Sequence, residues 1–233
     1  MNYQTMKKGI FIARPNRFIA QVELDGKIEI CHVKNTGRCK ELLRPGVTVW
    51  LEKSNNPARK TAYDLISVKK GEEWVNVDSQ APNQVAAEWL PQSGLFPKET
   101  VFRREVKKGN SRFDFCAEMG EKRCWIEVKG VTLEQNGIAK FPDAPTERGA
   151  RHLRELVDAV TEGDEAMALF IIQMKGVSEL IPNDETDPTF GRALRTAAEA
   201  GVQILAVDCI VAPNRLIADR QIQINLSFFE KTC

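Results

Sequence analysis

Short runs of alternating apolar and polar residues fill the first part of the chain. The runs with the length and period of strands are 9–13, 17–24, 27–33, 47–52, 62–68 and 74–77. Asp25-Gly26 lies between the second and third runs, and this dipeptide predicts a tight hairpin turn. Short strands at this density predict a small β-barrel of the oligonucleotide/oligosaccharide-binding (OB) type, although the pattern also allows other small β folds.

The hydrophobic pattern changes after residue 81. A helix with one apolar stripe is predicted over 82–90 and ends at Pro91. The other predicted elements are strands at 101–106, 112–118, 124–129, 166–173 and 202–207, and helices at 146–160 and 187–200. Thr146 is predicted to cap the first of these helices, and Gly201 to end the second. This order predicts an α+β protein with two domains, 1–81 and 82–233, the second built on a mixed sheet with crossover helices.

Composition excludes several classes of protein. Of the 233 residues, 42% are hydrophobic and 28% are charged, which is typical of a globular chain and unlike a disordered, collagen-like or disulfide-scaffold one. Apolar runs are too short for a membrane helix, and the N-terminus lacks a signal-peptide apolar region, so we expect a cytoplasmic protein. The six cysteines include no C-x-x-C pair and are expected to be free thiols.

The charge of the chain is unevenly divided. A formal net charge of +1 argues at first against a nucleic-acid binder, because such proteins are usually basic. Residues 1–90, however, hold 14 Lys and Arg against 10 Asp and Glu, whereas 91–233 hold 19 against 22. A local basic run, 98–112, ends at Arg112. The basic parts allow modest binding of a polyanion, and an ordinary solvated surface is the alternative.

Carboxylates are the candidate chemistry, because phosphate-binding glycine loops, G-x-S-x-G and H-E-x-x-H are absent. Asp114 stands between two phenylalanines on one predicted strand, and Glu127 and Lys129 share one face of the next strand. If these strands pair as a hairpin, Asp114 meets Glu127, and two carboxylates form a site for a divalent cation such as Mg²⁺ or Mn²⁺. Together with Lys129 they give the D…(D/E)-x-K pattern of metal-dependent nucleases.

A surface ion pair between Glu127 and Lys129 is the alternative interpretation of this pattern. Burial favours the metal site, because the strand around Glu127 is apolar on both faces, and a charge there needs a partner or a cation. Glu88 or Glu105 could add a third carboxylate, although each is also a candidate surface residue.

Basic and aromatic residues that could contact nucleic acid occur in both domains. In the first domain they are Arg14, Arg17, Phe18, Asn35 and Arg38, on or beside barrel strands. In the second domain Arg148 and His152 lie near the start of the helix at 146–160, where the helix dipole favours phosphate. The alternatives are a solvated barrel rim and an ordinary charged helix face.

With these residues assembled, the chain resembles the sugar fermentation stimulation protein A (SfsA) family. The matching stretches run nearly from end to end. They include Arg17-Phe18, Asn35-Thr36-Gly37, Pro45-Gly46, Val49-Trp50, Ser111-Arg112-Phe113-Asp114-Phe115, Ile126-Glu127-Val128-Lys129, Phe141-Pro142-Asp143-Ala144 and Thr146-Glu147-Arg148-Gly149. The last two stretches, with His152-Leu153 after them, form a block that is long and unusual enough to be nearly diagnostic.

The resemblance implies an N-terminal OB-type barrel and a C-terminal restriction-endonuclease-like α/β domain of the PD-(D/E)xK class, whose motif falls on Asp114, Glu127 and Lys129. It also implies non-specific DNA binding and a regulatory role in sugar (maltose) metabolism. We therefore expect a DNA-binding protein with a Mg²⁺ or Mn²⁺ site and nuclease activity. The alternatives are a catalytically inactive DNA-binding regulator on the same fold and a sugar-binding protein. RNA as a partner and a homodimer stay open.

Overall fold

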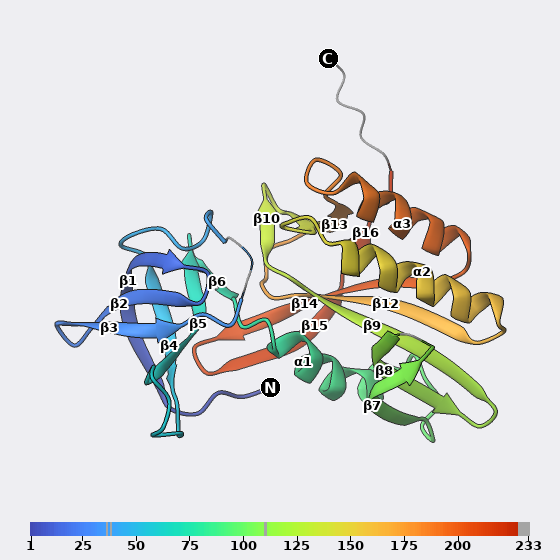
Figure 1. Cartoon of the computed structure of the whole chain (residues 1–233), viewed down its shortest axis with the longest axis horizontal. Helices are drawn as coiled ribbons and strands as arrows, with labels where there is room; N and C mark the ends of the chain where they lie inside the picture. The colour runs from blue at the N-terminus through green and yellow to red at the C-terminus, as the bar shows by residue number, and fades with distance from the viewer. Residues whose placement is uncertain (36, 38, 110, 228–233) are drawn as a thin grey trace, which may run out of the picture.

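The first domain is a closed barrel. The computed structural model describes residues 1–35, 37, 39–109 and 111–227, and it places this barrel beside a larger α/β domain (Figure 1). The barrel strands are β1 (Met6–Asn16), β2 (Ile19–Leu24), β3 (Lys27–His32), β4 (Thr48–Lys53), β5 (Tyr63–Lys70) and β6 (Glu73–Asn76). They pair in the order β3-β2-β1-β4-β5-β6, and a parallel pairing of β3 with β5 closes the barrel. The predicted OB-type barrel is confirmed.

The turn between β2 and β3 follows directly from the sequence. Asp25 and Gly26 have φ values of 52° and 75°, and positive φ at both central residues is the requirement of a type I′ turn. Gly adopts this conformation without steric cost, and Asp tolerates it better than most residues. The flanking strands pair with Leu24 opposite Lys27. The predicted hairpin is therefore confirmed.

The second domain is a mixed sheet with helices on both faces. Its elements are α1 (Ala81–Trp89), η1 (Leu90–Gln92), β7 (Val101–Lys108), β8 (Ser111–Met119), β9 (Lys122–Val131), β10 (Leu133–Gln135), β11 (Ile138–Phe141), α2 (Glu147–Thr161), β12 (Glu165–Ile172), β13 (Glu179–Pro182), α3 (Pro188–Glu199), β14 (Gln203–Ala212), β15 (Arg215–Gln221) and β16 (Gln223–Ile224). The main sheet has the order β15-β14-β12-β9-β8-β7, with β9, β12 and β14 parallel. In Figure 1, α1 covers one face, and α2 and α3 cover the other.

Side-chain caps set the start of both long helices. The Thr146 hydroxyl accepts the N–H of Gly149 at 3.0 Å, and the Asp187 carboxylate accepts the N–H of Phe190 at 2.9 Å. Each bond satisfies a backbone donor that has no partner inside its helix. Gly201 follows α3 with a φ of 97°, as expected of a residue that ends a helix. The predicted helices are confirmed.

A second, smaller sheet was not predicted. It contains β10, β11, β13 and β16 in that order, and β11 pairs in parallel with β13. These strands are too short for an alternating pattern to identify, and their parallel partners come from distant parts of the chain. β15 was also missed, because several of its alternating positions are exposed at the edge of the main sheet.

Buried polar side chains join the two domains. Gln173, which follows β12, donates its Nε2 to Asn76 Oδ1 at 2.8 Å and to the Asp78 carbonyl at 3.0 Å. The Asp78 carboxylate accepts from Lys34 Nζ at 3.0 Å and from the Tyr3 hydroxyl at 3.3 Å. Asn76, Asp78 and Gln173 are at most 1% exposed, so protein groups must satisfy them in place of water. This network fixes the barrel against the end of β12.

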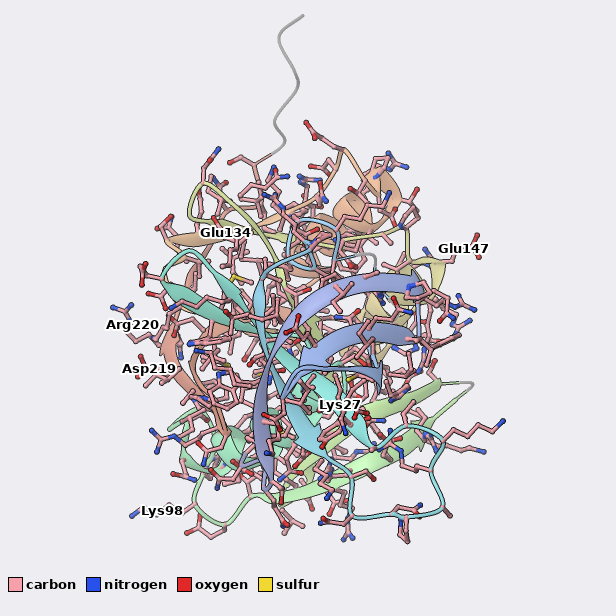
Figure 2. All side chains as sticks on the ribbon, turned by 90° about the vertical axis from the view of Figure 1, so that its left-hand side faces the viewer. Lys27, Lys98, Glu134, Glu147, Asp219 and Arg220 are labelled. Atoms are coloured by element: carbon pink, nitrogen blue, oxygen red, sulfur yellow. The ribbon has the colours of Figure 1, made fainter. Side chains whose placement is uncertain are left out.

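Side chains project on all sides in the view onto the barrel, and six charged ones are labelled (Figure 2). In that view Lys27, the first residue of β3, lies on the face of the barrel turned to the viewer, and Glu147 projects on the side opposite Asp219 and Arg220. Glu134, of the small sheet, lies near the upper edge. No helix in the described part of the chain has both the length and the apolar character needed to cross a membrane.

The described cysteines are free and buried. They are Cys31, Cys39, Cys116, Cys124 and Cys209, whereas Cys233 lies outside the described residues. Burial raises the pKa of the Cys31, Cys39 and Cys124 thiols to about 12. Thiols with such a pKa remain protonated at neutral pH and are poor nucleophiles. The described thiols therefore contribute to packing, as free cysteines were expected to do.

Asp64 forms an ion-pair cluster on strand β5 of the barrel domain. Its carboxylate is 5% exposed and accepts from Arg59 Nη1 at 3.0 Å. Lys34 Nζ lies 3.5 Å from the same group, and His32 Nδ1 lies 3.1 Å from it. Burial by itself raises the pKa of the Asp64 carboxyl, but the Arg59 hydrogen bonds and the Lys34 charge outweigh burial and hold the pKa below its ordinary value.

This lowered pKa predicts that the protein loses stability in acid. A carboxyl with a lowered folded pKa stabilises the fold above its unfolded pKa, about 3.9, and that contribution is lost as the pH falls through the folded value. At pH 7, Asp64→Asn is expected to lower the free energy of unfolding by about 1.5–3 kcal/mol, the usual contribution of hydrogen bonds to a charged group. In urea denaturation, the difference in free energy of unfolding between Asp64→Asn and wild type should become smaller below about pH 4. The exposed Asp25, paired with Lys7 at 3.4 Å, offers Asp25→Asn as a control that removes a carboxylate from an exposed ion pair. If Asp64→Asn lowered the free energy of unfolding by the same amount at all pH values, the lowered pKa of Asp64 would be contradicted.

Candidate functional site

Strands β8 and β9 bring two carboxylates together. The strands are antiparallel, with Phe115 opposite Ile126 as the last pair of the ladder, and Asp114 and Glu127 are the next residues on the two strands. The Val128 N–H, which a regular ladder would use for a backbone partner, instead donates to Asp114 Oδ2 at 2.8 Å. At Asp114 a hydrogen bond from the backbone to a side chain therefore replaces the backbone hydrogen bonds between β8 and β9.

Asn83 holds the other oxygen of Asp114. Its Nδ2 donates to Asp114 Oδ1 at 2.6 Å from helix α1. Two donors from different elements thus fix the orientation of the Asp114 carboxylate. Asn83 was not among the predicted site residues. A signal was present, because Asn83 lies three residues before Ala86 and seven before Leu90, so it is a polar residue on the apolar stripe of this helix.

Glu127 is a buried anion with one free oxygen. The residue is 4% exposed, and its Oε1 accepts from Lys129 Nζ at 2.6 Å and also contacts His152 Nδ1. Its Oε2 is buried and has no hydrogen-bond partner among the described residues. The alternative of a surface ion pair therefore does not hold, since the pair with Lys129 lies inside the protein. An ionised oxygen without a partner in such a place points to a cation.

The environment separates the pKa values of the two carboxyls. Burial and the charge of Glu127 raise the pKa of Asp114 above its ordinary value, against the hydrogen bonds from Val128 and Asn83. Burial also acts to raise the pKa of Glu127, but the His152 hydrogen bond and the Lys129 charge outweigh it and hold this pKa below its ordinary value. The repulsion between these two carboxylates is the kind of strain that a bound divalent cation relieves.

The donor set fits a hard divalent cation with few protein ligands. Two carboxylates converge, and the free Glu127 Oε2 supplies a ligand atom. No cluster of three or more His, Cys, Asp or Glu in the described ranges could hold a metal. Such a site does not suit structural zinc, which takes four protein ligands. It does suit Mg²⁺ or Mn²⁺, since Mg²⁺ is usually bound by one or two carboxylates together with water and phosphate oxygens.

His152 does not lie where the sequence placed it. It was predicted to contact phosphate, but it is 2% exposed and packs edge-on to Phe113, with ring centroids 6.3 Å apart. Arg148, one helical turn earlier, is exposed, and its Nε donates to His152 Nε2 at 3.3 Å. His152 is on the face of α2 that packs on the sheet, so nucleic acid cannot touch it directly. Arg148 remains accessible.

The barrel residues divide into exposed and internal ones. Phe18 is 45% exposed, with the Arg17 guanidinium 4.8 Å from the centre of its ring. Arg14 instead donates to the carbonyls of Asn35 and Gly37 at 2.6 and 2.7 Å and so holds the loop after β3. Arg38 lies outside the described residues.

The basic run and the proposed extra carboxylates lie apart from the pair. Arg112 and Glu105 are both exposed and form an ion pair at 2.9 Å. Glu88 pairs with the amino group of Met1 and accepts from Gln84 at 2.9 Å. Neither Glu88 nor Glu105 joins Asp114 and Glu127 in a metal-binding cluster. Neither residue therefore adds a third carboxylate to the pair, and both are surface residues, which was the alternative for each.

A polar cavity of about 110 Å³ lies between the two domains. Asn35 and Ser79 line it from the barrel side, and Lys140 and Asp143 line it from the second domain. Gly130, the residue after Lys129, also lines it, and a Cβ at Gly130 would lie 2.6 Å from Pro82. The barrel loop that carries Asn35 is therefore close to the strand that carries Glu127 and Lys129.

Comparison with known proteins finds two sequence models that match successive parts of the chain. Residues 12–77 match the sequence model described as "SfsA N-terminal OB domain", and residues 80–215 match "Sugar fermentation stimulation protein RE domain". The chain is 54% identical over 226 residues to the sugar fermentation stimulation protein homolog of Ruminiclostridium cellulolyticum, covering 97% of this chain and 100% of that one. It is 56% identical over 211 residues to the homolog of Clostridium beijerinckii, covering 91% and 93%.

A solved structure has the same fold over its full length. The structure of SfsA from Pyrococcus furiosus in complex with Ca²⁺ superimposes with a TM-score of 0.85 at 28% sequence identity. The superposition covers 97% of this chain and 98% of that one. Both domains, and not only one of them, are therefore shared with that structure.

Proposed function

This chain belongs to the sugar fermentation stimulation protein (SfsA) family, and from that premise we propose that it is a DNA-binding protein with a Mg²⁺- or Mn²⁺-dependent nuclease site. The observation that carries the proposal is the buried pair of Asp114 and Glu127 beside Lys129, with Glu127 Oε2 left without a partner. An effect on sugar metabolism would then follow from action on DNA.

Binding of a divalent cation is consistent with what is known of a structural relative. The Pyrococcus furiosus protein was solved in complex with Ca²⁺. Ca²⁺, Mg²⁺ and Mn²⁺ are hard cations that prefer oxygen ligands, and they differ mainly in size and in ligand number. Asp114 and Glu127 would hold the ion here. When bound, it would lower the pKa of a coordinated water and neutralise charge on a phosphate.

The chain's own groups have distinct roles in this proposal. Lys129 Nζ, now on Glu127 Oε1, would stabilise the negative charge that develops on phosphate oxygens during hydrolysis. Asn83 and the Val128 N–H orient Asp114. Arg148, exposed at the start of α2, would bind the backbone of the substrate.

The barrel would hold the nucleic-acid strand. Arg17 and the exposed Phe18 offer a charge and a ring on which a base can stack. The loop with Asn35 borders the same cavity as Gly130, so a strand on the barrel could reach the carboxylates. These contacts carry no sequence readout, so we expect binding with little sequence preference and a steep dependence on salt.

The proposal predicts cleavage that depends on Lys129. Wild type is expected to cleave plasmid, single-stranded DNA or RNA with Mn²⁺ or Mg²⁺ and to lose this activity in EDTA. Lys129→Ala should lower the rate by about 100-fold, the size typical of removing one preorganised group that stabilises the transition state. Lys70→Ala is the matched control, since Lys70 also pairs with a glutamate, Glu134, but outside the site.

The outcome separates the two main functions. Equal cleavage by wild type and Lys129→Ala would reveal a contaminating nuclease and refute the proposed site. Salt-sensitive DNA binding without cleavage under any cation would support the alternative of a non-catalytic regulator that uses the fold as a platform. The cleavage rates of plasmid, single-stranded DNA and RNA, measured side by side, show whether DNA or RNA is preferred.

A further inference from the structure

A series of contacts runs from exposed Arg148 through buried His152 to Glu127. We propose that this series orients Glu127 for the divalent cation, with His152 as the positioning residue and Arg148 as the group that sets its tautomer. The inference rests on the proposed function, because it concerns the same carboxylate. It gives His152 a role in cation binding in place of the predicted contact with phosphate.

Arg148 determines where the imidazole proton lies. Its Nε–H can only donate, and it points to His152 Nε2 at 3.3 Å. A ring nitrogen that accepts a hydrogen bond carries no proton, so the neutral ring has its proton on Nδ1. Nδ1 is the atom that contacts Glu127 Oε1. His152 is therefore set as a donor toward the carboxylate.

Two donors on one oxygen decide which oxygen is left for a cation. Glu127 Oε1 accepts from His152 and from Lys129 Nζ, while Oε2 has no partner in the described part of the chain. Turning the carboxylate out of this plane would break both bonds and leave the buried His152 donor unsatisfied. The carboxylate is therefore held with Oε2 free, and this orientation exists before any ion arrives.

The imidazole is itself held in place. His152 is 2% exposed on the inner face of α2, and the Phe113 ring packs against it at 64°. Phe113 precedes Asp114 on β8, so the same strand positions one carboxylate and supports the group that orients the other. Outer partners that fix a metal ligand in this way typically contribute about 10- to 100-fold in metal affinity.

The test compares two amides that differ in reach. In His152→Asn the amide N–H₂ can occupy the position of Nδ1 and donate to Glu127, whereas in His152→Gln the longer side chain places its amide near Nε2. Mn²⁺ affinity of the full chain, without nucleic acid, is measured from the free-Mn²⁺ signal in electron paramagnetic resonance titrations. His152→Gln is expected to weaken binding by about 10- to 100-fold, and His152→Asn to stay close to wild type.

Two further variants make the result interpretable. His32→Gln is the matched control, because His32 also contacts a carboxylate through Nδ1, that of Asp64 at 3.1 Å, but in the barrel domain. It should leave Mn²⁺ affinity unchanged. Arg148→Met removes the donor to Nε2 from an exposed position, so the fold should persist, and the freed tautomer should weaken Mn²⁺ binding less than His152→Gln does. If His152→Gln does not fold, the Mn²⁺ affinity of Arg148→Met tests the positioning role of His152 in its place.

Each outcome supports or refutes a specific claim. Weak binding by His152→Gln with recovery in His152→Asn supports the positioning role. Equal Mn²⁺ affinity in wild type, His152→Gln and Arg148→Met refutes that role and leaves the proposed metal site standing. Equal losses in His152→Asn and His152→Gln, matched by equal falls in urea midpoint, assign His152 to packing alone. If wild type binds no Mn²⁺, the metal site of the proposed function is refuted, and this inference with it.

Discussion

Glu127→Gln is expected to lower Mn²⁺-dependent cleavage by about 10⁴-fold or more, the loss found when the carboxylate of a catalytic unit is neutralised or removed. The amide has no charge, and it puts an N–H₂ group or a weak acceptor where the free Oε2 now lies. Lys129 would also lose its buried counter-charge. Substituting a residue that only orients Glu127 should cost about 10- to 100-fold in Mn²⁺ affinity. Glu127→Gln removes the ligand itself, so it should lower Mn²⁺ affinity by more than about 100-fold.

Both effects are measured on protein shown to be folded by circular dichroism. Glu134→Gln is the matched control, because Glu134 is also a partly buried glutamate paired with a lysine, Lys70. It should retain wild-type cleavage and Mn²⁺ affinity. Asp114→Asn should resemble Glu127→Gln, since it removes the other carboxylate of the pair. Cleavage by Glu127→Gln within tenfold of wild type would place the active groups elsewhere in the chain.

Asp78→Ala is expected to lower the free energy of unfolding by about 3 kcal/mol or more, because it breaks a buried ion pair. Asp78 is fully buried where the barrel meets the second domain, and its carboxylate accepts from Lys34, Tyr3 and the N–H of Gln80. Burial by itself lowers the pKa of Lys34, but Asp78 outweighs burial and raises it. Alanine leaves Lys34 with Asp64 alone and the Tyr3 hydroxyl without this acceptor.

Urea denaturation followed by tryptophan fluorescence and by circular dichroism measures this loss. Because Asp78 joins the domains, the two signals should separate in Asp78→Ala if the barrel now unfolds apart from the second domain. Asp78→Asn, which keeps the shape and one acceptor oxygen, should cost less. A loss below about 1 kcal/mol in Asp78→Ala would show that the junction does not depend on this charge.

Local patterns were sufficient for the main elements of the fold. The Asp25-Gly26 turn, the Thr146 cap and the apolar run of β12 each predicted their structure, because the relevant contacts lie within a few residues or within one covered strand. The same holds for the closeness of Asp114 and Glu127, since β8 and β9 are consecutive strands joined by a short turn, and each residue lies directly next to the pair of Phe115 and Ile126.

Other parts of the site could not be predicted in this way. Asn83 and His152 reach the carboxylates from α1 and α2, elements separate from the hairpin, and His152 was assigned to the surface because its helix face was ambiguous. Glu88 and Glu105 were candidate metal ligands because they are carboxylates near the pair in sequence. In the structure Glu88 instead pairs with the amino group of Met1, and Glu105 pairs with Arg112. The small sheet of β10, β11, β13 and β16 was missed because its strands are short and its pairings are distant.

The sequence by itself determined the two-domain division, the barrel and mixed sheet, and the pairing of two carboxylates with a lysine. The tertiary structure decided that this group is buried, that Oε1 of Glu127 is occupied and Oε2 is free, and that the barrel lies beside it. The reason is physical. Periodicity reports which face of one element is apolar, whereas contacts between elements depend on how their surfaces pack, and the spacing of residues along the chain does not encode that packing.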